Sequence, residues 1–304
     1  MWVTKLQVTG CVIDFQGIFK LFAGGQQTLI KQQQFGSLLR EEKWDDAVEW
    51  KKNMALHYKR DSQCFENGKN LVKKAAAFRE KNMLEEAVLY ADVASVLFEE
   101  SNLSSEMVLP HLEICMAEMK ETVLAMAGGR SNPFGTDDSI RYIPAIKNYT
   151  LPQMRLGSEK LKRHLRPTFT DETLLYIWCL HYIEYCEGLV GEMENQKKTL
   201  KKAICLMTTT FSQDACKHRV FGYFHHNLGV MYFKKNKLLK SFERLTIAVK
   251  AKSKATDYPN NTEKYSDITR TQTELQKLER TTCPFHEYKD SKAMRQSLEA
   301  YGLL

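Results

Sequence analysis

The chain has 304 residues, of which 43% are hydrophobic and 27% charged, and this balance argues against disorder over most of its length. Only 15 Gly and 7 Pro are present, which disfavours an all-β protein with frequent turns and favours long helices joined by short loops. The net charge of +7 is too mild to indicate nucleic acid binding by itself. We therefore expect an all-α protein.

The cysteines and the apolar segments bear on the compartment. The eight Cys lie mostly within apolar helical segments, as small buried hydrophobic residues do in a reducing compartment. The first 25 residues make a poor signal peptide, because they have one early Lys, an Asp in their apolar part and no clear cleavage site. The most apolar window, 174–190, is interrupted by His181, Glu184 and Glu187, and is too short for a membrane span. We expect a cytoplasmic protein without integral membrane insertion.

Residues 1–25 form a poorly defined extension, and N-terminal helical repeats are predicted at 26–127. In the segment 70–100, small and aromatic residues recur at helical spacing around a turn at Asn82, so two helices could pack closely. The positions that carry this pattern are Ala75, Phe78, Ala87, Ala91 and Ala94. A similar pattern, shifted by one residue, occurs at Gly36, Leu39, Trp44, Ala47 and Met54.

The main loop is predicted at 128–144, which is the densest stretch of Gly, Pro and Asp in the chain. C-terminal helical repeats are expected at 145–280, followed by a tail at 281–304 with a capping helix from about Lys289 to Ala300. The other helices are predicted at 104–126, 151–167, 171–190, 192–210 and 262–279.

The clearest unit is a helical hairpin between residues 222 and 252. The basic turn KKNK at 234–237 separates two amphipathic segments. Gly229 would remove a side chain where the two helices approach, and Tyr232 would fill the gap beside it. Ser241 and Ala248 supply small side chains on the second helix. Small and large residues would therefore interlock across the hairpin.

This order, a Leu-Gly pair followed by an aromatic and by small residues on the second helix, resembles the tetratricopeptide repeat, a helix-turn-helix unit of about 34 residues. The recurrent units are longer than that minimum and are similar to SNAP-like helical arrays. The resemblance implies a right-handed superhelix of stacked hairpins, an α-solenoid of about six to seven units. Such an array is a protein-binding scaffold rather than an enzyme.

A second, local resemblance covers residues 33–80. The stretch QQFGSLLREE with Trp50, and KKAAAFRE at 73–80, resemble the early part of the TPR-like helical proteins that associate with huntingtin. This resemblance implies a huntingtin-partner-like role, and it identifies no functional residue.

The repeat resemblance suggests three partner-binding residues. In tetratricopeptide arrays, an Asn just before the Leu-Gly pair often faces the concave surface and bonds a ligand backbone or carboxylate, and here that residue is Asn227. Arg270 falls near a suitable place on the next helix, and Lys234 lies in the basic turn. A clamp for a C-terminal carboxylate is incomplete, because the preceding unit offers Glu184 and Glu187 rather than Lys and Asn.

Metal and catalytic sites are weaker readings of the sequence. Cys216, His218, His225 and His226 lie within eleven residues, but neither they nor the CPFH stretch at 283–286 completes paired zinc-ligand spacings. The chain contains no phosphate-binding glycine motif and no nucleophile elbow. We expect neither a cofactor nor a metal, and no small-molecule substrate.

Basic clusters leave a second functional class open. They comprise Lys160, Lys162, Arg163, His164 and Arg166; Lys197, Lys198, Lys201 and Lys202; and Lys234, Lys235, Lys237 and Lys240. They are either solvated faces or a patch for an acidic partner.

From the repeat resemblance, the chain is expected to be a scaffold that holds a partner peptide or helix in a concave groove. The alternative is a basic-surfaced adaptor at acidic membranes or RNA.

Overall fold

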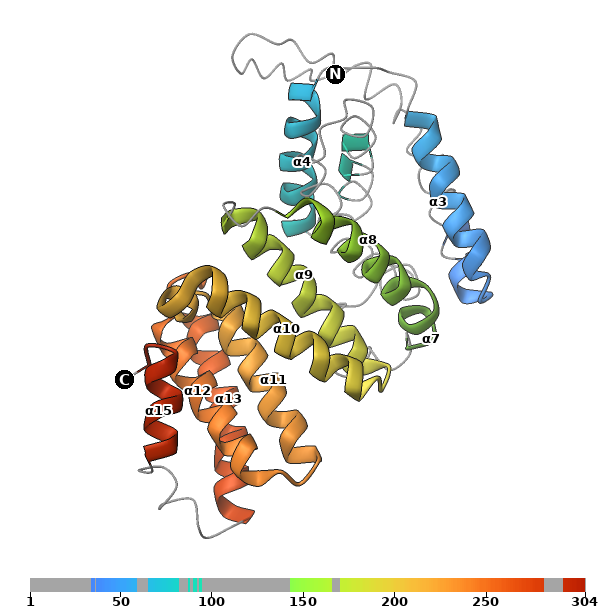
Figure 1. Ribbon diagram of the computed structural model, residues 1–304. Coiled ribbons are helices and arrows are strands. Elements are labelled where there is room, and N and C mark those ends of the chain that lie inside the picture. The colour runs from blue at the N-terminus through green and yellow to red at the C-terminus, as the bar shows by residue number, and fades with distance from the viewer. Residues whose placement is uncertain are drawn as a thin grey trace.

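The computed structural model describes residues 34–35, 37–58, 65–81, 87, 90–91, 93–94, 143–165, 170–281 and 292–303 (Figure 1). Every regular element within these residues is a helix, which confirms the all-α prediction for the part of the chain described. Successive helices pack against one another, and from α9 to α12 they form antiparallel pairs (Figure 1). No helix in the described ranges is long and apolar enough to cross a membrane.

The N-terminal helices are α3 (Trp44–Tyr58) and α4 (Phe65–Glu80). Of the predicted small positions, Ala75, Ala87 and Ala94 are buried, and the Phe78 ring stacks on Tyr90 at 5.2 Å between centroids. These alanines leave room for close packing in this region. The predicted extension at 1–25, the helix at 104–126 and the loop residues 128–142 lie outside the described residues.

A helical run covers the junction between the two halves. It consists of α7 (Ile143–Ala145), the π-helical η2 (Ile146–Thr150) and α8 (Leu151–His164). The predicted loop extended to residue 144, but Ile143 and Pro144 lie in α7, because proline is well suited to the first turn of a helix. Tyr149 meets the Phe35 ring edge to face at 5.6 Å and so links this run to the N-terminal helices.

The next antiparallel pair is α9 (Thr170–Leu189) and α10 (Met193–Phe211). Gly191 forms the turn between them with φ of 79°, a left-handed conformation that glycine adopts without steric cost. Buried residues from both helices, including Ile177, Leu180, Leu200 and Met207, join one large core. A short 3₁₀ helix, η3 (Ser212–Lys217), leads into the following pair.

The hairpin predicted at 222–252 is formed by α11 (Arg219–Lys234) and α12 (Leu238–Lys254), with Asn236 in the turn at φ of 54°. Gly229 lies where the two helices approach closely, because a Cβ built on it would be 2.8 Å from Leu245 Cγ. Buried Ser241 donates a hydrogen bond to the carbonyl of Gly229 at 2.9 Å. Tyr232 and Ala248 are also buried.

The described chain ends with α13 (Asn261–Thr281) and α15 (Lys292–Ala300). Helix α13 packs on α12 and touches α11. Helix α15 contributes Met294 and Leu298 to the large core, together with Leu303 after its end. It lies within the capping helix predicted at 289–300, of which residues 289–291 are not described.

Candidate functional site

Aromatic side chains gather where α9 and α11 meet. The Trp178 and Tyr223 rings are 6.1 Å apart, and the His181 and Tyr223 rings are 5.3 Å apart. His181 also contacts the ring of Tyr182 at 5.8 Å. These four side chains are only half-buried, in contrast to the fully buried Phe224 behind them. These side chains, together with Glu263 and Arg270 of α13, form the surface that we call the α9–α11–α13 face.

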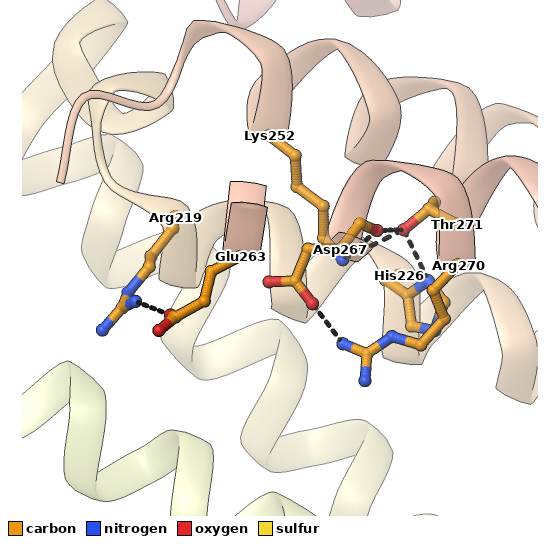
Figure 2. Close-up of polar contacts among 7 residues, drawn as sticks. All are labelled: Arg219, His226, Lys252, Glu263, Asp267, Arg270 and Thr271. Atoms are coloured by element: carbon orange, nitrogen blue, oxygen red, sulfur yellow. Dashed lines mark hydrogen bonds and ion pairs between the residues drawn. The ribbon is translucent and has the colours of Figure 1, made fainter. Parts of the chain in front are cut away.

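Arg219, at the start of α11, extends this aromatic group toward α13. Its guanidinium lies 5.2 Å from the Trp178 ring centroid and 5.7 Å from that of Tyr258. It also pairs with Glu263 of α13 at 3.5 Å, as Figure 2 shows. Arginine stacked on aromatic rings combines a large apolar contact with a charge. Arg219 therefore ties all three helices together at one end of the face.

Asn227 lies on the α11 part of the face, where its amide is already engaged. Its Nδ2 donates to Glu184 Oε1 of α9 at 2.6 Å, and Gln196 Nε2 of α10 donates to the other oxygen of that carboxylate at 3.1 Å. Glu184 is fully buried, and His181 Nδ1 lies 3.0 Å from its Oε1. Asn227 thus holds a buried carboxylate, and its second amide N–H and its amide oxygen are left for the ligand contact that the sequence suggested.

Arg270 lies on the α13 edge of the face. It is exposed, with 62% of its side chain accessible, and bonds Asp267 Oδ1 at 2.8 Å. Tyr185 of α9 feels its charge: burial raises the pKa of Tyr185, whereas Arg270 lowers it. The fold therefore brings Arg270 of α13 near Tyr185 of α9. Lys234 is exposed two turns after Asn227, which places it on the same side of α11.

A buried polar cluster lies beneath the α13 edge. Lys252 of α12 is fully buried, and its Nζ donates to the carbonyl of Asp267 at 3.2 Å and to Thr271 Oγ1 at 3.0 Å. His226 Nδ1 lies 3.0 Å from the same threonine hydroxyl. Figure 2 shows these side chains of α11 and α12 meeting α13 at one point, with Arg270 on the outer side of Asp267.

The pKa values of Lys252, His226 and Tyr223 are shifted in this cluster. Burial lowers the pKa of Lys252 to about 7; the Asp267 carboxylate opposes this effect, and the charge of Arg270 adds to it. Burial also lowers the pKa of His226 to about 3, helped by Lys252 and Arg270. Burial first, and the Asp267 carboxylate second, raise the pKa of Tyr223. Near neutral pH the cluster therefore contains a neutral imidazole and a lysine close to its titration point.

Four residues of this region were not predicted from the sequence as members of a site: Lys252, Asp267, Thr271 and Arg219. One signal was available for Lys252, which follows Ser241, Leu245 and Ala248 on the buried stripe of α12. A lysine on such a stripe must find buried partners or leave the interface. Its partners come from α13, and no spacing rule within one helix identifies them.

The described Cys and His residues considered above as metal ligands do not converge on one point. Cys216 Sγ bonds the Gln213 carbonyl at 3.1 Å, and His225 is buried between Phe221 and Tyr301, away from His226. Among the described residues, no group of three His, Cys, Asp or Glu side chains could hold a metal ion. Cys283 and His286 lie outside these residues.

Neither protein-family models, nor curated proteins, nor solved structures give a match to this chain. The candidate site therefore stands on its own geometry.

Proposed function

We propose that this chain is a non-enzymatic scaffold, a TPR-like right-handed array of helical hairpins that binds a partner peptide or helix on the α9–α11–α13 face. In such an array the first helix of each hairpin lines one face, and here these helices are α9, α11 and α13. The packing of α11 against both α9 and α13 supports this arrangement. The binding surface is then built from three consecutive units.

The observation that carries the proposal is the half-buried group of aromatic and arginine side chains on this face. Tyr, Trp and Arg are the residues that most often dominate binding energy at protein interfaces. Trp178, Tyr182, Tyr185, Tyr223 and Arg219 are all partly accessible here. Because the rings of Trp178, Tyr182 and Tyr223 already pack against a neighbouring ring, they would lose little side-chain entropy on binding.

The test is quantitative affinity purification of the full chain from cells, comparing Tyr185→Ser with the control Tyr265→Ser. Tyr265 is 68% exposed on α13 and points away from the face, about 200° around the helix from Asp267. A partner bound on the face should be depleted by Tyr185→Ser and retained by Tyr265→Ser. If the two variants retain every partner equally, the face is not the binding surface.

The second functional class, a basic-surfaced adaptor at acidic membranes or RNA, has one observation in its favour. Lys235 of the α11–α12 turn pairs with Glu194 of α10, and this contact brings two of the basic clusters together. The exposed lysines of α10 beside it are Lys198, Lys201 and Lys202. Salt separates the two classes, because binding through these lysines should fall steeply between low and physiological ionic strength. Binding through the aromatic face should persist.

A further inference from the structure

The stem of Lys252 passes through the contact between α11 and α12 on its way to α13. A Cβ built on Gly222 of α11 would lie 2.5 Å from Lys252 Cγ, so glycine at this position leaves the space that the lysine occupies. The Lys252 Nζ then lies 5.0 Å from the Tyr223 ring centroid. The lysine is therefore built into the interface of three helices.

The hydrogen-bond partners of Lys252 are uncharged. Its Nζ bonds a main-chain carbonyl and a threonine hydroxyl, both from α13, whereas the Asp267 carboxylate is engaged by Arg270. A buried ammonium is costly unless a counter-charge pairs with it directly. The protonated form of Lys252 therefore gains from moving into water, and it can do so only if α13 separates from α12.

The apolar packing of α13 lies near its C-terminal end, where Leu275 and Leu278 meet Phe242 and neighbouring apolar side chains of α11 and α12. Of its described side chains, only Thr271 and Leu278 are fully buried. The other contacts near its start are polar, and they include the Arg219–Glu263 pair. Segments with few buried apolar contacts open at low free-energy cost. A change in one buried charge can therefore shift the docking of the first half of α13, where the contacts are polar.

Building on the function proposed above, we propose that protonation of Lys252 releases α13, so that acidification opens the α13 edge of the α9–α11–α13 face and weakens partner binding. The charged and titratable groups that face Lys252 are Tyr223 and His226 of α11 and Asp267 and Arg270 of α13. Protonation of His226 acts in the same direction, because its ring is buried against Thr271.

The lowered pKa values agree with this geometry. Lys252 has a pKa of about 7 when docked, against an ordinary value of 10.5, and His226 has a pKa of about 3, against 6.5. Linkage then predicts that lowering the pH from 8 to 6 raises the open fraction of α13 about tenfold through Lys252 and about fourfold more through His226.

The experiment is hydrogen–deuterium exchange of the full chain at pH 8 and pH 6, with rates corrected for intrinsic exchange. Amides of 261–281 should lose about fortyfold in protection on acidification, whereas those of α9 and α11 should not. In Lys252→Met the loss should shrink to about fourfold. Lys240→Met, an exposed change on the same helix, should behave as the wild type. Equal protection at both pH values, or the same loss in Lys252→Met as in the wild type, would overturn the proposal.

A direct titration of the Lys252 side chain by NMR gives a second readout. A midpoint near 7 supports the proposal, and a midpoint near 10 contradicts it. Both measurements use the chain alone, so they do not depend on a partner. A partner that bound the face equally at pH 8 and pH 6 would overturn this inference and leave the proposed function in place.

Discussion

The two interfaces of α12 are built in opposite ways. Toward α11 the two helices pack closely because small residues lie between them. Gly229 lies against Leu245, and Ser241 donates a hydrogen bond to the Gly229 carbonyl. Toward α13 the contact includes buried Lys252, whose hydrogen-bond partners are neutral, beside an apolar cluster that contains Phe242 and Leu278. The contacts around Gly229 involve no titratable group and so do not respond to pH, whereas a buried amine does. We therefore call the α11–α12 contact around Gly229 the fixed frame. We call the α12–α13 contact around Lys252 the conditional interface, because we expect its stability to depend on pH.

The largest expected effect concerns the conditional interface. The pKa of Lys252 is lowered to about 7 in the folded chain from 10.5 when exposed, so between these values the unfolded chain binds more protons. The free energy of unfolding should fall by about 3 kcal/mol through this residue between pH 9.5 and pH 7. Denaturant melts across this range measure the fall, and Lys252→Met should remove most of it. If the free energy of unfolding fell equally in the wild type and in this variant, Lys252 would not be the source of the pH dependence.

The next effect concerns the fixed frame. In Gly229→Val the added side chain meets Leu245 at the closest approach of α11 and α12, and such overpacking costs about 1 to 3 kcal/mol. Gly229→Ala is the control, since the helix propensity of alanine offsets part of its smaller clash. The measurement is the midpoint of denaturant unfolding. An unchanged midpoint in Gly229→Val would show that the helices can move apart here without loss.

A smaller effect should connect the two interfaces. Gly222→Ala places a methyl group against the Lys252 stem and should destabilise the wild type by about 1 kcal/mol. Shortening the lysine in a Lys252→Ala background removes the clash. A double-mutant cycle measured by denaturant melts should therefore give a coupling energy of about 1 kcal/mol between these positions. Additive effects would mean that the stem is free to move aside.

The smallest effect is expected at the surface. Arg270→Gln removes an exposed ion pair with Asp267, and such pairs contribute about 0 to 1 kcal/mol. Thermal unfolding should change little, while binding of a face-dependent partner should weaken. A large loss of stability would place Arg270 in the frame that holds α13, rather than at the edge of the binding face.

The hairpin of α11 and α12 could be predicted from sequence because its signals are local. The 3.6-residue period, the turn at Asn236 and the small residue Gly229 all lie within one segment of the chain. The Lys252 cluster could not be predicted in the same way. It depends on α13 docking against α12, and the lysine is one of many along a basic helix.

The hydrogen bond of Asn227 could likewise not be predicted from the sequence. The repeat resemblance suggested that this residue contacts a ligand. Its amide, however, bonds Glu184, which lies 43 positions earlier in the chain. Neither residue's immediate neighbours indicate this contact. A repeat pattern indicates which side of a helix a residue occupies, but not which partner satisfies its polar atoms.

Binding of a partner polypeptide to the α9–α11–α13 face can be tested by site-specific photo-cross-linking in cells. A photoreactive amino acid is placed at position 182 or 270 on the face, at 265 on the outer side of α13, or at 201 on the basic surface of α10. We predict that one partner polypeptide cross-links from 182 and 270 and not from 265 or 201. Cross-links formed only from 201 or 265 would contradict the account.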